Sequence, residues 1–124
     1  MPTKSNLMGS GCPALQAVAS LGIPTVGQTA TGASQNSLTL PSDFVVYTTV
    51  TLNNGPTLPA ENAQNTATDQ YIIVNHGANS MNVWPPTGGK IGTGSTNAAL
   101  AVPAGKTAWF LHIGSGNYAA SVSA

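Results

Sequence analysis

Two histidines, His76 and His112, are the first residues of this chain whose side chains could bind a metal or move a proton. A zinc site would need a further ligand from Cys12 or from one of three carboxylates, and none of these has a motif-like spacing to either histidine. His76 is expected in a turn, before Gly77, and His112 lies in an alternating run, where it is expected to be half exposed. The sequence therefore predicts no metal and no cofactor.

The other groups that could carry catalysis are the carboxylates of Asp43, Glu61 and Asp69 and the thiol of Cys12. Two carboxylates can hydrolyse a glycosidic bond. However, Asp43 and Asp69 both stand before predicted strands, in positions where aspartate usually closes a turn. Cys12 lies in a glycine-rich stretch with no neighbouring base, so an inert thiol is expected. We therefore expect no catalytic residues and a protein that is not an enzyme.

Two glycine-rich stretches have some likeness to nucleotide-binding motifs. Gly105-Lys106-Thr107 matches the end of a phosphate-binding loop, but the first glycine of that motif would fall at Leu100. A predicted strand also follows it, in place of a helix. The stretch 88–94 follows two prolines and opens no helix, so it lacks the context of a dinucleotide-binding turn. Neither stretch predicts nucleotide binding.

The composition is unusual in its lack of charge. The 124 residues fit one domain, and only 5% of them are charged, against about 25% in an ordinary domain. Three scattered lysines cannot neutralise several phosphates, so no nucleic-acid partner is expected. With a net charge of zero, repulsion between copies is weak, which favours a surface covered by a partner or by the protein itself. The alternative is a secreted or structural domain with a low-charge surface.

No stretch is typical of a membrane span or of a secretion signal. No run approaches about 18 apolar residues, and glycine, serine and proline interrupt the start of the chain before an apolar signal region forms. A single cysteine excludes an internal disulfide framework. We therefore expect no membrane partner and a protein made in a cytoplasm.

The hydrophobic pattern divides the chain into an arm and a β domain. Residues 1–36 are rich in small polar residues and are expected to form an extended N-terminal arm, whose last part, 27–36, is expected as a loop or a weak edge strand. Within it, the segment 13–21 has a proline start and a glycine end that favour a short helix. Between residues 37 and 124, short β-branched and aromatic runs alternate with turn signals. This pattern predicts an all-β class: a compact antiparallel β-sandwich or barrel-like, jelly-roll-like domain.

The stretch 71–86 is expected to organise this domain. Four strand-forming residues, 71–74, lead into a turn rich in glycine and asparagine, and a second alternating run, 81–84, leaves it. That arrangement is typical of a β-hairpin. Further strands are expected at 37–40, 44–52, 98–102, 106–113 and 118–122.

Aromatic residues on the predicted strands are the candidates for packing in the core or between subunits. In the run 106–113, Trp109 shares one face with Leu111 and Ile113, while Phe110 and His112 take the other face. A platform on which sugars stack is an alternative role, because aromatic faces support such stacking. The residues assigned to self-association or packing are Tyr71, Trp84, Trp109, Phe110 and Tyr118.

Three stretches together resemble small proteins of tailed bacteriophages that are encoded among head-morphogenesis genes. The resemblance covers most of the chain. Similar Asn-x-Gly-Ala-Asn hairpins also look like modules of phage fibres and tail proteins. The stretches are Lys4-Ser5-Asn6-Leu7-Met8-Gly9-Ser10-Gly11 with Pro13-Ala14, the strand 43–50, and Tyr71-Ile72-Ile73-Val74-Asn75-His76-Gly77-Ala78-Asn79 leading to Val83-Trp84-Pro85-Pro86-Thr87-Gly88-Gly89.

The resemblance implies a capsid decoration, or cement, protein. Such a protein is expected as a β-rich homotrimer on the capsid exterior of the virion, where an arm binds the major capsid protein. Because ordering an arm costs conformational entropy, buried apolar contacts must offset that cost. The apolar arm residues available for capsid anchoring are Leu7, Met8, Leu15, Val18 and Leu21. The alternative is a fibre or adhesin module that binds a host-surface glycan through exposed aromatics and the loop 87–97.

Overall fold

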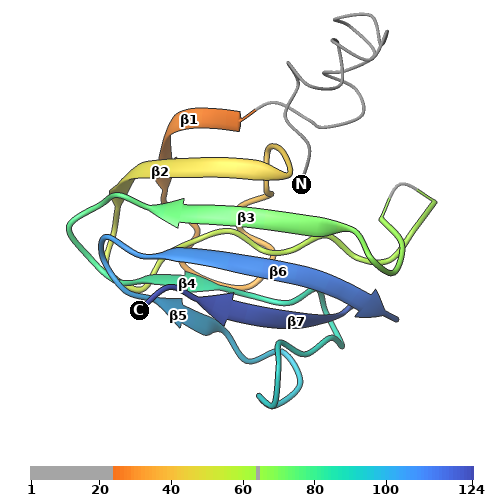
Figure 1. The fold of residues 1–124 in the computed structure, drawn as a ribbon. Coiled ribbons are helices and arrows are strands. Elements are labelled where there is room, and N and C mark those ends of the chain that lie inside the picture. Colours follow the sequence, from red (N-terminus) through yellow and green to blue (C-terminus); the bar gives the residue numbers. More distant parts are fainter. Residues whose placement is uncertain (1–23, 64) are drawn as a thin grey trace, which may run out of the picture.

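The computed structural model describes residues 24–63 and 65–124, and this part of the chain is all-β (Figure 1). The predicted all-β class is therefore confirmed, with a mixed larger sheet in place of the antiparallel one expected. Within the described residues there is no helix, and so none with the length and apolarity needed to cross a membrane. The short helix predicted at 13–21 lies outside the described residues.

Seven strands form two sheets. The larger sheet has the order β1-β2-β3-β6-β7, and the smaller one pairs β4 with β5. Pairing is parallel between β1 and β2 and between β2 and β3, and antiparallel for β3–β6, β6–β7 and β4–β5, so the larger sheet is mixed. The strands are β1 (Pro24–Ala30), β2 (Phe44–Val50), β3 (Gln70–Asn75), β4 (Met81–Val83), β5 (Leu100–Val102), β6 (Thr107–Gly114) and β7 (Asn117–Val122).

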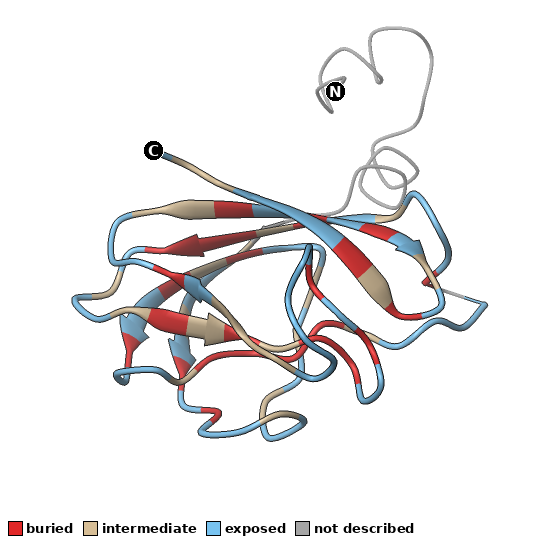
Figure 2. Ribbon diagram, turned by 90° about the horizontal axis from the view of Figure 1, so that it is seen from below, coloured by how far each residue is buried: buried red, intermediate tan, exposed pale blue. Residues whose placement is uncertain are grey.

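The strands follow the period of two that separates the faces of a sheet. In β6, Ala108, Phe110 and His112 are buried, while Trp109 and Leu111 between them are exposed. Figure 2 shows this alternation of buried and exposed positions along the strands. The two faces predicted for the run 106–113 are therefore confirmed.

The core lies between the two sheets, in a two-layered, sandwich-like arrangement. The small sheet and the connections around it cover one side of the five-stranded sheet (Figures 1 and 2). Large side chains from both layers meet there, including Tyr47 and Phe110 from the large sheet and Met81 and Val102 from the small one. Burial of these side chains, at roughly 1.5–3 kcal/mol each, is the main favourable contribution to holding the layers together.

The hairpin predicted for 71–86 is wrong, because β3 and β4 belong to different sheets. Both edges of β3 are already paired, one with β2 and the other with β6, so no edge is left for β4. The buried Asn75 redirects the chain. Its Oδ1 accepts from Gly77 N at 2.9 Å, and its Nδ2 donates to Asn79 O and to Val102 O, both at 2.9 Å. One amide therefore shapes the turn and joins β3 to β5.

Two segments before β2 can be compared with their predicted form. Pro24–Ala30, within the range assigned to the arm, is the edge strand β1 of the large sheet, which overlaps the edge strand given as one alternative for 27–36. The strand expected at 37–40 is reduced to a single bridge between Thr39 and Thr57. The residues before Thr39 form a polar turn instead of a strand. In this turn Ser37 Oγ donates to Ser34 O at 2.6 Å.

At Gly55 the loop after β2 lies close to the backbone of strand β4. Its N–H donates to Gly32 O at 2.9 Å, and a Cβ at this position would collide with Asn82 O and lie 2.7 Å from Met81 Cγ. We expect Gly55→Ala to lower the free energy of unfolding by about 2–3 kcal/mol, because the backbone of β4 must shift. Urea denaturation measures this loss.

Gly94→Ala is the matched control for that substitution. The nearest atom to an added Cβ there is Ile91 O at 3.1 Å, at an exposed position in a loop. It should cost less than about 1 kcal/mol. Equal losses for the two variants would contradict the tight approach at Gly55.

Candidate functional site

The side of the five-stranded sheet that faces away from the core is uncharged and largely apolar, and we call it the outer face. Its central row follows the strand register from Phe44 on β2 through Ile72 on β3 and Trp109 on β6 to Ser121 on β7. A second row, two residues toward one end of the sheet, is Gln70, Leu111 and Ala119. The third row, toward the other end, is Val46, Val74 and Thr107.

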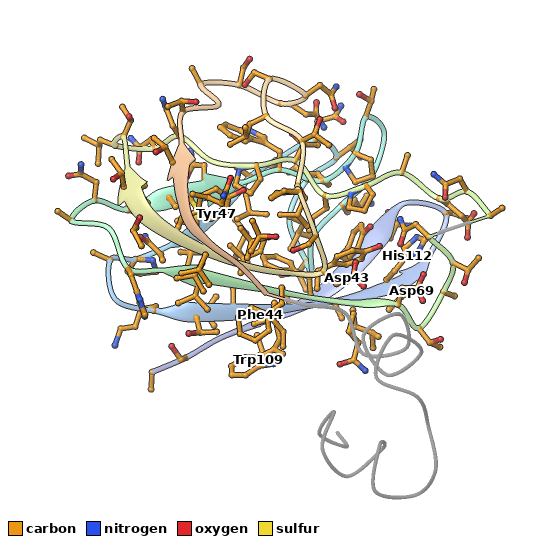
Figure 3. The ribbon with its side chains drawn as sticks, turned by 90° about the horizontal axis from the view of Figure 1, so that it is seen from above. Asp43, Phe44, Tyr47, Asp69, Trp109 and His112 are labelled. Atoms are coloured by element: carbon orange, nitrogen blue, oxygen red, sulfur yellow. The ribbon has the colours of Figure 1, made fainter. Side chains whose placement is uncertain are left out.

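Large hydrophobic side chains are exposed on this face. Trp109 is 46% exposed and Ile113 is 59% exposed, and Phe44 and Leu111 are also exposed. Figure 3 shows Phe44 and Trp109 together on the side of the sheet opposite Tyr47. Val74, which the strand alternation places on the same face, is only 7% exposed. A continuous patch of this kind is typical of an interaction surface.

The outer face carries no charge. None of the five charged residues in the described part of the chain lies within a strand. Asp43 and Asp69 stand immediately before β2 and β3, at one end of the sheet. Lys106 stands before the antiparallel β6, at the opposite end, where its carbonyl accepts from Asn75 N. Three of the five charges therefore stand at the two ends of the sheet, and the other two, Glu61 and Lys90, lie in loops.

An open hollow of about 290 Å³ lies on the outer face beside Trp109. Its polar lining comes from Gln70 and Ser121, and the rest is apolar. An aromatic ring next to an amide and a hydroxyl is one arrangement on which a sugar ring stacks. The hollow could equally accept an apolar side chain, because its lining contains no ionisable group.

A buried hydrogen-bond network holds the inner side of the same strands. Tyr71 Oη donates to Asn65 Oδ1 at 2.7 Å, and Asn65 Nδ2 donates to Tyr118 Oη at 3.0 Å and to Pro59 O and Ala60 O at 2.9 Å. Tyr118 Oη donates in turn to Pro59 O at 2.6 Å. The rings of Tyr71 and Tyr118 meet edge to face, 6.0 Å apart. The network ties the loop before β3 to both β3 and β7.

His112 is fully buried, so the half-exposed position expected for it is wrong. Its ring stacks on Tyr118 at 4.9 Å, and its Nε2 accepts from Gly116 N at 3.2 Å. The residue lies on the core side of β6, where the turn to β7 supplies a donor for the imidazole. These contacts give His112 a packing role. His76 is exposed just after β3, in the turn as predicted.

The carboxylates do not assemble a metal site. Among the described residues no group of three or more metal-ligating side chains is found. Asp69 accepts from Thr66 N at 2.9 Å and so closes the turn before β3, as predicted. Burial, together with the nearby Asp69, raises the pKa of Asp43 above its usual value. Gly105-Lys106-Thr107 leads into the strand β6, as predicted, and Lys106 Nζ donates to Ala124 O at 2.6 Å.

The loop 87–97 is held by its own hydrogen bonds. Asn97 Oδ1 accepts from Gly88 N at 2.7 Å, and Asn97 N donates to Gly89 O at 2.9 Å. Ile91 is buried in the core, and Gly92 N donates to Tyr118 O at 2.7 Å. The loop is therefore fixed along the edge of β7 near its start.

The residues assigned to self-association or packing occupy different places. Tyr71, Phe110 and Tyr118 are in the core, Trp84 is half-buried, and Trp109 is on the outer face. The anchoring residues assigned to the arm lie outside the described residues. Sequence reasoning placed Leu111 and Ile113 beside Trp109 but gave them no role, and it missed Phe44. The parallel register that brings Phe44 next to Ile72 is a property of the sheet and leaves no local signal.

Comparison of the chain with known protein families, with curated proteins and with solved structures finds no match. The outer face is therefore interpreted from its own geometry. An uncharged, aromatic-containing sheet face can form protein contacts.

The buried tyrosines make stability sensitive to alkali. Burial raises the pKa of Tyr118 to about 12, although its hydrogen bond from Asn65 acts in the opposite direction. Burial likewise raises the pKa values of Tyr47 and Tyr71. Between about pH 10 and pH 12 the unfolded chain has lost these protons and the folded chain keeps them, so the free energy of unfolding falls as pH rises. Urea midpoints measured at increasing pH should be constant up to about pH 9 and then decline.

Tyr118→Phe is the control for this alkaline decline. It removes one ionisable group and should cost about 1 kcal/mol at neutral pH, for the lost hydrogen bonds. The decline above about pH 10 should then be shallower than in the unchanged protein. A midpoint that stays constant through about pH 12 would contradict the burial of the phenols.

Proposed function

We propose that this protein is a capsid decoration, or cement, protein: a structural component of a phage virion that binds the outside of the head and stabilises the shell. Its partners under this proposal are the major capsid protein and further copies of itself. The resemblance described above supplies the setting, and the outer face supplies the physical support. No catalytic step is part of the proposal.

The observation that carries the proposal is the exposed, uncharged outer face. It spans the three rows described above and extends to Ile113, beyond the Leu111 row, and Trp109 and Ile113 are among its most exposed large side chains. A protein that acts alone in solution gains nothing from such a patch, which promotes association. A protein that works as part of a shell can bury the patch when it assembles. A contact surface of this kind therefore supports a structural role.

The two parts of the chain have separate roles in the proposal. The sandwich-like domain forms a rigid knob, held together by its core and by the Asn65 network. The arm anchors the knob on the shell through Leu7, Met8, Leu15, Val18 and Leu21. The conformational entropy that the arm loses on binding must be offset by the burial of these five side chains. The self-association implied by the resemblance is a homotrimer.

A second candidate function is an adhesin or fibre module that binds a host-surface glycan. The hollow beside Trp109 favours it, because Gln70 and Ser121 place an amide and a hydroxyl next to an exposed indole. Titration with oligosaccharides should then change the fluorescence of Trp109, and Trp109→Ala should abolish the change. The two candidates also differ in copy number, since cement covers the head and an adhesin occupies a tail or a vertex.

The cement proposal predicts that the arm is needed for binding to heads. A chain without residues 1–22 should bind expanded heads at least about a hundredfold more weakly, because five apolar anchors are lost. Co-sedimentation of each protein with heads that lack it measures the affinity, and imaging of the particles gives the number of copies. The unchanged protein should be found in many copies over the head.

The shortened chain must have the same urea midpoint as the whole protein, which controls for loss of the fold. Full affinity without residues 1–22 would refute the anchoring role of the arm. A few copies confined to a tail or vertex would refute the cement function and favour the adhesin.

A further inference from the structure

We propose that the outer face is covered by the outer face of a second copy of this chain, related by a two-fold axis that runs across the strands along the Phe44–Ile72–Trp109 row. The pairing is a two-fold contact that is separate from the homotrimer of the proposed function, and it concerns the purified protein. It can therefore be tested without heads and can fail independently of capsid binding.

The size of the outer face is sufficient for a specific contact. Five strands spaced about 4.8 Å apart give a width of about 24 Å, and six residues of β3 give a length of about 20 Å. Two such faces together bury about 1,000 Å², which is the lower limit for a specific protein interface. Because the area is near this limit, we expect a dissociation constant in the micromolar range, about 1–100 μM.

The charge distribution fits a second copy better than a charged partner. The strands in the described part of the chain contain no charged residue, so two outer faces meet without repulsion. An acidic or a basic partner would find no complementary charge on the face. With the axis across the strands, the Asp69 end of each sheet lies over the Lys106 end of the other. Opposite charges then come together at both margins of the contact.

The rows of the face are also complementary under this axis. The central row meets itself, which places the two Trp109 rings near each other on the axis, one strand away from the middle strand β3. The Leu111 row of one copy meets the Val74 row of the other, strand over strand, so that Leu111 lies over Thr107 and Gln70 lies over Val74. Two sheets packed in this way lie about 10 Å apart with their strands within about 30° of alignment. Aromatic residues at the centre are typical of the residues that dominate binding energy.

The pairing constrains the assembly to an even number of copies. A face that contacts the same face of a second copy through a two-fold axis can bind only one partner. A dimer satisfies this condition, and so do two trimers joined face to face. A single trimer does not, because three faces cannot all be paired.

The test is sedimentation equilibrium of the full-length protein from about 2 to 200 μM, which brackets the expected constant. The expected result is reversible association of 12.4 kDa chains into an even-numbered species. In a Trp84→Phe background, Trp109 should lose access to a soluble quencher as the protein associates. A monomer at every concentration, or a trimer as the largest species, overturns the pairing. A monomer in which Trp109 is shielded from the quencher also overturns the pairing, because the outer face is then covered by a group other than a second copy.

Two lysine substitutions with matched exposure test the surface itself. Ile113 and Leu52 are both 59% exposed, but Ile113 lies on the outer face and Leu52 lies in the turn after β2. Ile113→Lys should raise the dissociation constant at least about thirtyfold, and Leu52→Lys should leave it within about twofold. Trp109→Lys is a second variant of the face with the same expected result. Equal effects of Ile113→Lys and Leu52→Lys overturn the assignment.

Head binding separates this inference from the proposed function. A protein that dimerises as described but does not bind heads overturns the cement function alone. A protein that coats heads but stays monomeric overturns the pairing alone.

Discussion

The side-chain amide of Asn65 is the contact on which the orientation of the large sheet depends. It binds the hydroxyl groups of Tyr71 and Tyr118 and two carbonyls of its own loop. Breaking one of these bonds would leave a buried polar group unpaired, at a cost of about 1–3 kcal/mol. With Tyr71 and Tyr118 held inward, the alternation of the strands turns Ile72 and Ala119 outward. The outer face is thus fixed from the inside of the domain.

Local sequence patterns predict the properties of this fold that depend on neighbouring residues alone, namely β propensity and the alternation of buried and exposed positions. The β-branched and aromatic runs predict an all-β domain, and the alternation around Trp109 assigns both faces of β6 correctly. Pairing between distant strands is different, because it depends on which edges remain available. The turn after Asn75 has the composition of a hairpin turn, yet β3 is already paired on both sides. The exposure of His112 was predicted incorrectly for a related reason. The group that donates a hydrogen bond to its buried imidazole is Gly116 N, in the turn to β7.

The lack of charge has a different meaning in the structure than in the composition. In the sequence, charged residues are scarce along the whole chain. In the fold, the strands contain none of them, because Asp43, Asp69 and Lys106 all stand just outside the strands. An edge strand such as β1 normally carries a charge or a proline to prevent unwanted pairing. Here Pro24 begins that strand, and a bulge around Gly27 disturbs its register. The sheet limits growth at this edge by backbone geometry.

The parallel arrangement of β1, β2 and β3 also affects how the chain reaches its native state. Neighbouring strands in this half of the sheet are joined by long connections, from Ala30 to Phe44 and from Val50 to Gln70. The entropy of closing these loops must be lost before the strand contacts compensate for it, which slows folding relative to a sheet of hairpins. The β6–β7 hairpin, with two residues between its strands, has no such delay. We therefore expect the C-terminal part of the sheet to form early and the β1–β2 edge to join late.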